Sequence, residues 1–270
     1  KDGELVPVAW NEALSVTAGE LNRLKETYGP ESVAFYYGEG AGHQEIKYYI
    51  QRLANVFGTP NFSGVGSTCN FARTLADTLT LGAVTKPDIP NSKFLMIWGG
   101  NPFASNEPLP PRTINQFKKR GGYLVVIDPR KTEVAAKADI HLVIPPGLDE
   151  LLSLNMIHTI LREGVWDKPF TEKWVHGFDD FYQTVVADRF SPEKGEALTG
   201  IPSELVRKVA CVYARTKPAC NYMGNGLEHH AFGMRTMRLV AIMKAITGNL
   251  DVPGGDLFTD TPKLKHMARP

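Results

Sequence analysis

Phe94-Leu95-Met96-Ile97-Trp98-Gly99-Gly100-Asn101-Pro102 is the stretch of sequence that decides the fold. Five large apolar residues in a row, typical of a strand that is buried on both faces, end in a glycine turn. Tyr123-Leu124-Val125-Val126-Ile127 is a second run of this kind, and it ends in Asp128-Pro129-Arg130. Two such strands, separated by a helix-length segment, predict a parallel sheet with a nucleotide site at its carboxyl edge.

The pattern around these strands places the chain in the α/β class. Strands are predicted at residues 94–98, 123–127 and 140–144, and helices near 110–120, near 131–137 and at 149–163. Because strands that alternate with helices form a parallel sheet covered on both faces, we expect a Rossmann-like, three-layer αβα arrangement. Further segments are predicted as helices at 10–28, 43–57, 169–174, 202–216 and 231–247, and as strands at 33–37 and 219–223.

Composition excludes several classes of function. The 270 residues are 43% hydrophobic, which is enough for one large domain or two. With 30 Lys and Arg against 29 Asp and Glu, the chain is nearly neutral, which indicates neither a nucleic acid nor a membrane surface as partner. The three cysteines form no C-x-x-C pair, which argues against a self-contained zinc or iron-sulfur site. The chain shows no signal-peptide pattern and opens with Lys1, so we expect a piece of a longer protein and leave its cellular location open.

The residues that follow the first two strands allow more than one interpretation. Gly99-Gly100-Asn101-Pro102 could let backbone amides approach a phosphate or ribose, or could be an ordinary strand-to-helix turn. Asp128 could accept hydrogen bonds from sugar hydroxyls, and Arg130 could pair with a phosphate or stack on a base. No strand is followed by G-x-G-x-x-G, and Gly224-x-Gly226 supplies only two of these glycines, which disfavours NAD and FAD.

Gly147 and Asp149 follow the third strand, in Pro145-Pro146-Gly147-Leu148-Asp149. Asp149 is a good candidate for the N-cap of the next helix, which could be its only role. A carboxylate at this edge could also accept from the N1 and N2 donors of a guanine.

Cys69 lies in residues 62–70, a stretch without a convincing period, and such stretches are often functional loops. A lone cysteine is more often a small buried hydrophobe, but a thiolate in such a loop suits a soft or high-valent transition metal. His229 and His230 follow the glycine turn at 224–226 and could bind a phosphate, a pterin or a metal, or cap the following helix.

Taken together, these residues resemble the molybdopterin oxidoreductase family, the bis-molybdopterin guanine dinucleotide enzymes of the dimethyl sulfoxide reductase type. The matching motifs, in the family's order, are Gly58-Thr59-Pro60-Asn61, Cys69, Trp98-Gly99-Gly100-Asn101-Pro102, Ile127-Asp128-Pro129-Arg130, Pro146-Gly147-Leu148-Asp149, Gly224-Asn225-Gly226-Leu227-Glu228-His229-His230, Thr247-Gly248-Asn249 and Pro253-Gly254. Each is weak alone, whereas their order along nearly the whole chain is specific.

The resemblance implies roles for these positions. Cys69 stands where the family's protein ligand binds molybdenum or tungsten. Segments that hold one guanine dinucleotide arm match Gly100, Asn101, Pro102, Asp128, Pro129, Arg130, Gly147 and Asp149, and the segment near the other pterin matches Gly224, Gly226 and His230. Asn70 stands where formate dehydrogenases typically have histidine, which disfavours formate as substrate, and His229 stands where many members have glutamine.

The resemblance also implies the organisation of the complete protein. We expect two interleaved α/β domains, a discontinuous one at 1–65 and 220–270 and a Rossmann-like guanine-dinucleotide-binding domain at 66–219. An N-terminal segment with a 4Fe-4S cluster and a C-terminal pterin-binding domain would be missing, so the piece alone would be inactive.

The implied activity is two-electron, oxo-transfer-type chemistry on a small inorganic substrate in anaerobic respiration. A sulfur oxyanion or polysulfide, nitrate or arsenate fits a cysteine ligand. An iron-sulfur electron-transfer subunit and a membrane anchor are the implied partners. The alternative is a metal-free scaffold and electron conduit, like the large iron-sulfur subunit of NADH dehydrogenase.

Overall fold

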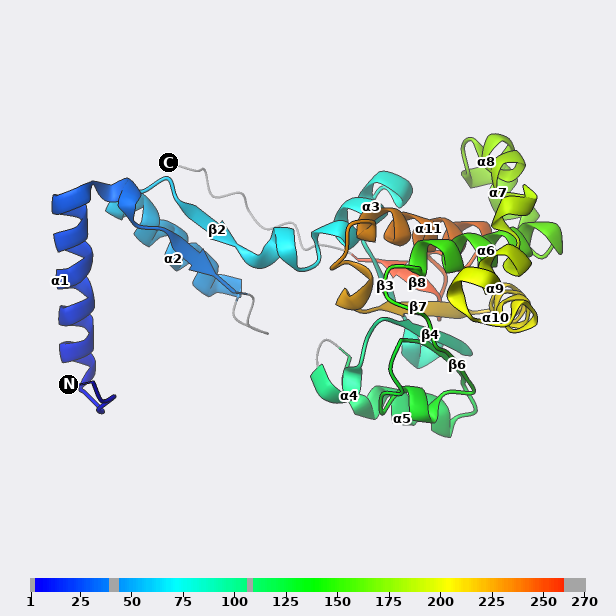
Figure 1. The fold of residues 1–270 in the computed structure, drawn as a ribbon, viewed down its shortest axis with the longest axis horizontal. Helices are drawn as coiled ribbons and strands as arrows, with labels where there is room; N and C mark the ends of the chain where they lie inside the picture. The colour runs from blue at the N-terminus through cyan, green and yellow to red at the C-terminus, as the bar shows by residue number, and fades with distance from the viewer. Residues whose placement is uncertain (1–2, 39–43, 106–108, 260–270) are drawn as a thin grey trace. The chain divides into compact units, whose positions relative to one another are not determined.

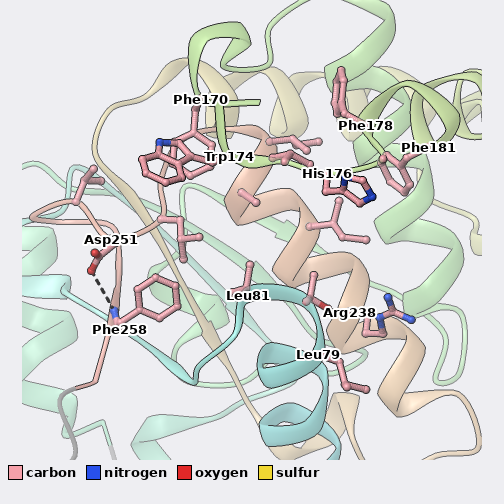
Figure 2. Close-up of a pocket in the computed structure, with 18 residues that line it drawn as sticks. Leu79, Leu81, Phe170, Trp174, His176, Phe178, Phe181, Arg238, Asp251 and Phe258 are labelled. Atoms are coloured by element: carbon pink, nitrogen blue, oxygen red, sulfur yellow. Dashed lines mark hydrogen bonds between the residues drawn. The ribbon is translucent and has the colours of Figure 1, made fainter. Parts of the chain in front are cut away.

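The computed structural model describes residues 3–38, 44–105 and 109–259, and the chain forms two compact units, Lys1–Ser67 and Thr68–Pro270 (Figure 1). Among the described residues, no helix combines the length and the apolar character needed to cross a membrane.

The first unit is built around one β-α-β element. Its helices are α1 (Trp10–Tyr28) and α2 (Gln44–Phe57), and its strands β1 (Phe35–Tyr37) and β2 (Phe62–Gly64) pair in parallel. The predicted helices are confirmed, except that His43 lies outside the described residues. Strand β2 falls in the stretch predicted to lack regular structure, because its pairing with β1 is a long-range contact that no local period reveals.

The second unit contains a four-stranded parallel sheet in the order β6-β5-β4-β7. Its strands are β4 (Phe94–Trp98), β5 (Tyr123–Ile127), β6 (Ile140–Leu142) and β7 (Ala219–Met223). The register aligns Trp98 with both Ile127 and Met223, so these strands end together. This confirms the predicted α/β class with a parallel sheet.

Helices cover both faces of this sheet, as Figure 1 shows for α5 on one side and α6 and α10 on the other. Alternate residues of β4 point to opposite faces: Leu95 and Ile97 pack in the cluster with Ile114 and Phe117 of α5. The opposite cluster combines Phe94, Met96 and Trp98 with apolar residues of α6, α10 and α11. The helices of the second unit are α3 (Phe71–Leu81), α4 (Pro102–Ser105), α5 (Pro111–Lys119), α6 (Asp149–Arg162), α7 (Lys168–Trp174), α8 (Phe178–Val185), α9 (Pro192–Thr199), α10 (Ser203–Arg215) and α11 (Gly233–Ile246).

Several local predictions differ from the structure in their bounds, among them the strand predicted at 33–37, which is β1 (Phe35–Tyr37). The helix expected near 131–137 is only a 3-10 turn, Ala135–Lys137, because the connection must return to the start of β6 within a few residues. Strand β6 is shorter than predicted, since it lies at the sheet edge and pairs only with Val125–Ile127 of β5.

The expected grouping of 220–270 with residues 1–65 stays a prediction about the complete protein. In this chain, β7 joins the sheet of the second unit. A second, antiparallel pair in this unit joins β3 (Thr85–Pro87) to β8 (Asp256–Phe258).

A buried ionic cluster joins β3, β8, α3 and α11 beside the sheet. The Lys244 ammonium lies 4.0 Å from Oδ1 of Asp77 and 3.8 Å from Oδ1 of Asp256, and it donates a 2.9 Å hydrogen bond to Thr85. Asn221 of β7 donates to the other oxygen of Asp256. All three charged side chains are at most 1% exposed, so two carboxylates share one cation away from solvent.

Candidate functional site

The structure brings most of the predicted site residues to one edge of the sheet. Gly99 and Gly100 follow β4, Asp128 follows β5, and Gly224 follows β7. Asp149 begins α6 after the loop that leaves β6. Because the strands are parallel, these carboxyl ends lie side by side, where open α/β sheets bind their ligands.

The turns after β4 and β7 pack backbone against backbone. The Gly224 amide donates a 2.8 Å hydrogen bond to the Trp98 carbonyl, and the Gly226 amide donates a 3.1 Å bond to the Gly99 carbonyl. A Cβ on Gly224 would lie 2.2 Å from the Gly99 oxygen. The mutual approach of the two turns is therefore itself a reason for glycine at these positions, beside any contact with a ligand.

Asp149 is held by a tryptophan of the neighbouring strand. Its Oδ1 accepts a 2.7 Å hydrogen bond from the indole Nε1 of Trp98, and the residue is 6% exposed. Leu148, not Asp149, is the N-cap of α6, so the capping interpretation is wrong: the Asp149 side chain points inward to Trp98. Oδ2 of Asp149 lies 4.0 Å from Nε2 of His230.

His230 presents an unsatisfied polar atom at this edge. Its Nε2 is buried and has no hydrogen-bond partner among the residues that the structure describes. Nδ1 faces the Phe232 amide at 3.4 Å, so the ring is anchored on one side only. A free, buried ring nitrogen can donate to or accept from a ligand, depending on the tautomer.

The turn after β5 is organised by Asp128, which is 5% exposed. Its Oδ1 accepts a 2.8 Å hydrogen bond from the backbone amide of Arg130, so part of its role is to shape the turn. The Arg130 side chain and Pro129 are exposed. A carboxylate already engaged by the backbone keeps its second oxygen available for a sugar hydroxyl.

Asn101 links this turn to the one after β4. Its Nδ2 donates a 2.9 Å hydrogen bond to Glu133, and this bond lowers the pKa of the Glu133 carboxyl. Oδ1 of Asn101 is buried without a partner among the described residues. Pro102 is buried at the start of α4. Glu133 was not predicted, because only the folded loops bring it to Asn101.

Gly147 differs from the other glycines of the site. Its φ of +89° lies in the left-handed region, and no atom lies within 4 Å of the position that a Cβ would occupy. The backbone conformation alone therefore explains glycine here.

Cys69 lies against the loop that follows β7. It is half-buried just before α3, and Nδ2 of Asn225 lies 3.7 Å from its Sγ. Nε2 of His229 lies 3.2 Å from the Cys69 carbonyl oxygen, an acceptor, so that nitrogen carries the proton when the bond forms. The cysteine and the segment 224–230, far apart in sequence, thus form one local structure.

Two ion pairs near the site were not foreseen. Arg73 of α3 pairs with Glu228 at 2.5 Å, and Arg235 of α11 pairs with Glu150 at 2.9 Å. Glu228 lies in the motif 224–230, but the partners of each pair are far apart in the sequence, so no local signal could have found the pairing.

Two of the sequence motifs have structural roles at the opposite end of the sheet. Oδ1 of Asn249 accepts a 3.1 Å hydrogen bond from the amide of Ala219, the first residue of β7. Gly254 has a φ of +83°, and a Cβ there would meet the Asn91 carbonyl oxygen at 2.5 Å. These residues fix where β7 begins.

Within residues 3–38, 44–105 and 109–259, no group of three or more His, Cys, Asp or Glu side chains is placed to hold a metal ion by itself. A metal bound at Cys69 would take its remaining ligands from elsewhere.

Comparison with known proteins gives one consistent family. The sequence model of the family described as molybdopterin oxidoreductase matches residues 1–261. Formate dehydrogenase H of Escherichia coli is 30% identical over 94% of this chain and 36% of its own length. The thiosulfate reductase molybdopterin-containing subunit PhsA of Salmonella typhimurium is 28% identical over 94% of this chain and 33% of its own length.

A solved structure agrees with this result. Acetylene hydratase from Pelobacter acetylenicus is 27% identical, with a TM-score of 0.75 over 94% of this chain and 34% of that protein. The chain thus spans about a third of the length of the relatives that it matches. With the family model covering nearly all of the sequence and the fold matching as well, the chain belongs to the molybdopterin oxidoreductase family.

Proposed function

We propose that this chain is the central part of a molybdenum or tungsten oxidoreductase that carries bis-molybdopterin guanine dinucleotide, with Cys69 as the protein ligand of the metal. The observation that carries the proposal is the contact of Cys69 with segment 224–230, 3.7 Å from Sγ to Nδ2 of Asn225, beside the carboxyl edge of a parallel sheet. Family membership supports it.

The residues at this edge fit such a group. A thiol is the soft donor that suits a high-valent transition metal, and Cys69 is only half-buried. Buried atoms without partners among the described residues, Nε2 of His230 and Oδ1 of Asn101, are available to a polar ligand. When bound, the cofactor supplies the two-electron chemistry.

The chain's own residues would bind and orient this cofactor. Cys69 would hold the metal, and His230 with the glycine turn at 224–226 would face one pterin. The turns with Gly100, Asn101 and Pro102, with Asp128, Pro129 and Arg130, and with Gly147 and Asp149 would hold one guanine dinucleotide arm. Asp149 keeps Oδ2 for guanine donors while Trp98 occupies Oδ1.

For the substrate we propose a small inorganic compound of the sulfur oxyanion, polysulfide, nitrate or arsenate class, converted by oxo-transfer-type chemistry in anaerobic respiration. Similarity to a thiosulfate reductase subunit supports the sulfur class. Formate is the second candidate, favoured by the 30% identity to formate dehydrogenase H and disfavoured by Asn70 beside Cys69.

The complete enzyme is proposed to hold a 4Fe-4S cluster in an N-terminal segment and to pass electrons to or from an iron-sulfur subunit, with a membrane anchor as a further partner. The discontinuous domain, 1–65 with 220–270, and the inserted domain, 66–219, remain part of this proposal.

The test is metal and nucleotide analysis of the full-length protein, purified without oxygen. We expect about one molybdenum or tungsten and two guanine nucleotides per chain, as two guanine dinucleotide arms require. Cys69→Ala and Cys69→Ser should keep the fold, change the spectrum of the metal and abolish or alter turnover, whereas Cys211→Ala on α10 should not. Absence of both metal and guanine from the wild type would favour the metal-free scaffold instead.

A further inference from the structure

Glu228 is a buried carboxylate bound by a single residue of another element. Its side chain is 1% exposed. Oε2 accepts a 2.9 Å hydrogen bond from the backbone amide of Arg73, and Oε1 accepts a 2.5 Å bond from the Arg73 guanidinium. Arg73 lies in the first turn of α3, directly after Cys69 and Asn70.

This arrangement is sensitive to displacement. A buried carboxylate is unfavourable unless it is paired and hydrogen-bonded, and here both contacts come from one residue. The Arg73 amide is one of the free donors at the start of a helix, so Glu228 also satisfies α3 at the end nearest Cys69. A shift of α3 away from the loop would leave both the carboxylate and the helix end unpaired.

The loop that carries Glu228 is itself fixed to the sheet. Gly224 and Gly226 bond to the backbone at the end of β4. At the other end of the loop, a Cβ on Gly233 would meet the Glu228 carbonyl oxygen at 2.5 Å, so the segment closes tightly upon itself. A continuous path therefore runs from the sheet through the glycine turn and Glu228 to Arg73 and the cysteine.

Among the described residues, two contacts of Cys69 come from the same loop. Asn225 approaches its Sγ, and His229 approaches its carbonyl oxygen. These contacts, at 3.7 Å and 3.2 Å, both lie at exposed positions. The shorter, partly buried contacts are those of the neighbouring Glu228, at 2.9 Å and 2.5 Å from Arg73.

We infer that Glu228, through Arg73, is the positioning residue that holds Cys69 against segment 224–230 and so directs its sulfur to the metal. The inference rests on the proposed function for the metal, but the positioning of the thiol can be measured without one. Removal of a polar group that orients a metal ligand commonly changes metal affinity or activity by about 10–100-fold.

The first experiment uses full-length enzyme prepared without molybdenum. The rate at which iodoacetamide alkylates each cysteine is followed by peptide mass spectrometry in the wild type, Glu228→Ala, Glu228→Gln and Glu193→Gln. Glu193 is the control, because it is an exposed carboxylate that pairs with Arg207 on a surface away from the site. Cys211 and Cys220 report whether the rest of the chain stays folded.

We expect Glu228→Ala to accelerate alkylation of Cys69 several-fold, with Cys211, Cys220 and the Glu193→Gln control unchanged. The alkylation rate of Cys69 in Glu228→Gln should lie between those of the wild type and Glu228→Ala. The glutamine amide oxygen can still accept from the Arg73 amide, although the charge is lost. If Cys69 were alkylated in Glu228→Ala at the same rate as in the wild type, the inference would be overturned. Faster labelling of all three cysteines in both Glu228 variants would also overturn it, because that would assign Glu228 to overall folding.

The second experiment uses the metal-loaded enzyme. Glu228→Ala should retain metal and guanine nucleotide, shift the electron paramagnetic resonance signal of the metal and lower turnover by about 10–100-fold. An unchanged signal with wild-type turnover would contradict the inference. Failure of the proposed function is distinct, because the wild type would then lack metal, or Cys69→Ala would leave the signal unchanged.

Discussion

The indole of Trp98, the last residue of β4, donates its Nε1 proton to the Asp149 carboxylate at the start of α6, 2.7 Å away. Trp98 is 1% exposed and Asp149 6% exposed. The bond joins the central strand to the helix that follows the edge strand β6, and it orients a carboxylate that we propose to face guanine.

Trp98→Phe should destabilise the 270-residue chain by about 1–3 kcal/mol or more, because it leaves a buried carboxylate oxygen without its donor and removes part of a core ring. Urea unfolding followed by circular dichroism measures the change. Trp174→Phe is the matched control, since Trp174 is 67% exposed. Equal, small effects of the two substitutions would show that the bond adds nothing to stability.

Two glycines of the site should respond differently to alanine. Gly224→Ala should lower the free energy of unfolding by more than about 3 kcal/mol. The new Cβ would lie 2.2 Å from the Gly99 carbonyl oxygen, and a backbone atom cannot rotate away from it as a side chain can. Gly147→Ala should cost only about 1–2 kcal/mol, the strain of a left-handed conformation in open space. Thermal and urea unfolding of both variants test the order, and the reverse order would contradict the observed packing of the two turns.

Lys244→Met should destabilise the second unit by about 3–5 kcal/mol, because Asp77 and Asp256 would remain buried without their cation. Adding Asp256→Asn should restore part of this loss by removing one of the two carboxylates. Chemical denaturation of the single and double variants gives the coupling energy. A double variant that is no more stable than Lys244→Met would argue against repulsion between the carboxylates.

Stability should depend on pH through Asp256. Burial raises the pKa of this carboxyl to about 6, above its ordinary value of 3.8, although Lys244 and Asn221 oppose the shift. The folded state therefore binds the proton more tightly than the unfolded state does. The resulting stabilisation is complete below pH 3.8 and is lost as the pH rises to about 6.

The measurement is the free energy of unfolding of the wild type and of Asp256→Asn between pH 4 and 7. Relative to the variant, the wild type should become less stable across that window by roughly 1–3 kcal/mol. If the free energy of unfolding of the wild type, relative to that of the variant, stayed constant or increased with pH, the carboxylate would be in a different environment.

Local patterns predicted the central architecture well. Strands β4 and β5 begin and end where the apolar runs do, because a strand buried on both faces needs large apolar residues throughout. Strand β7 also has its predicted bounds, although it carries the polar Asn221 at its centre. The positions after these strands could be predicted as a common edge, because parallel strands place their carboxyl ends together. The family assignment followed from the order of those positions.

Long-range pairing could not be predicted. Strand β2 and the β3–β8 pair depend on partners distant in sequence, and the contacts of Glu228 with Arg73 and of Trp98 with Asp149 exist only after folding. Asp149 shows the difference clearly: its position before a helix suggested a cap, whereas the neighbouring strand supplied a donor that turned its side chain inward.

The strand order has a consequence for how the site assembles. β7 is the last of the four strands along the chain, yet it pairs with β4, whose other neighbour is β5. Until Ala219–Met223 docks, the β4 edge is open and the glycine turns cannot meet, and such long loop closures are slow. The packing of the two glycine turns therefore depends on the β4–β7 pairing, and we expect release of β7 to separate these turns.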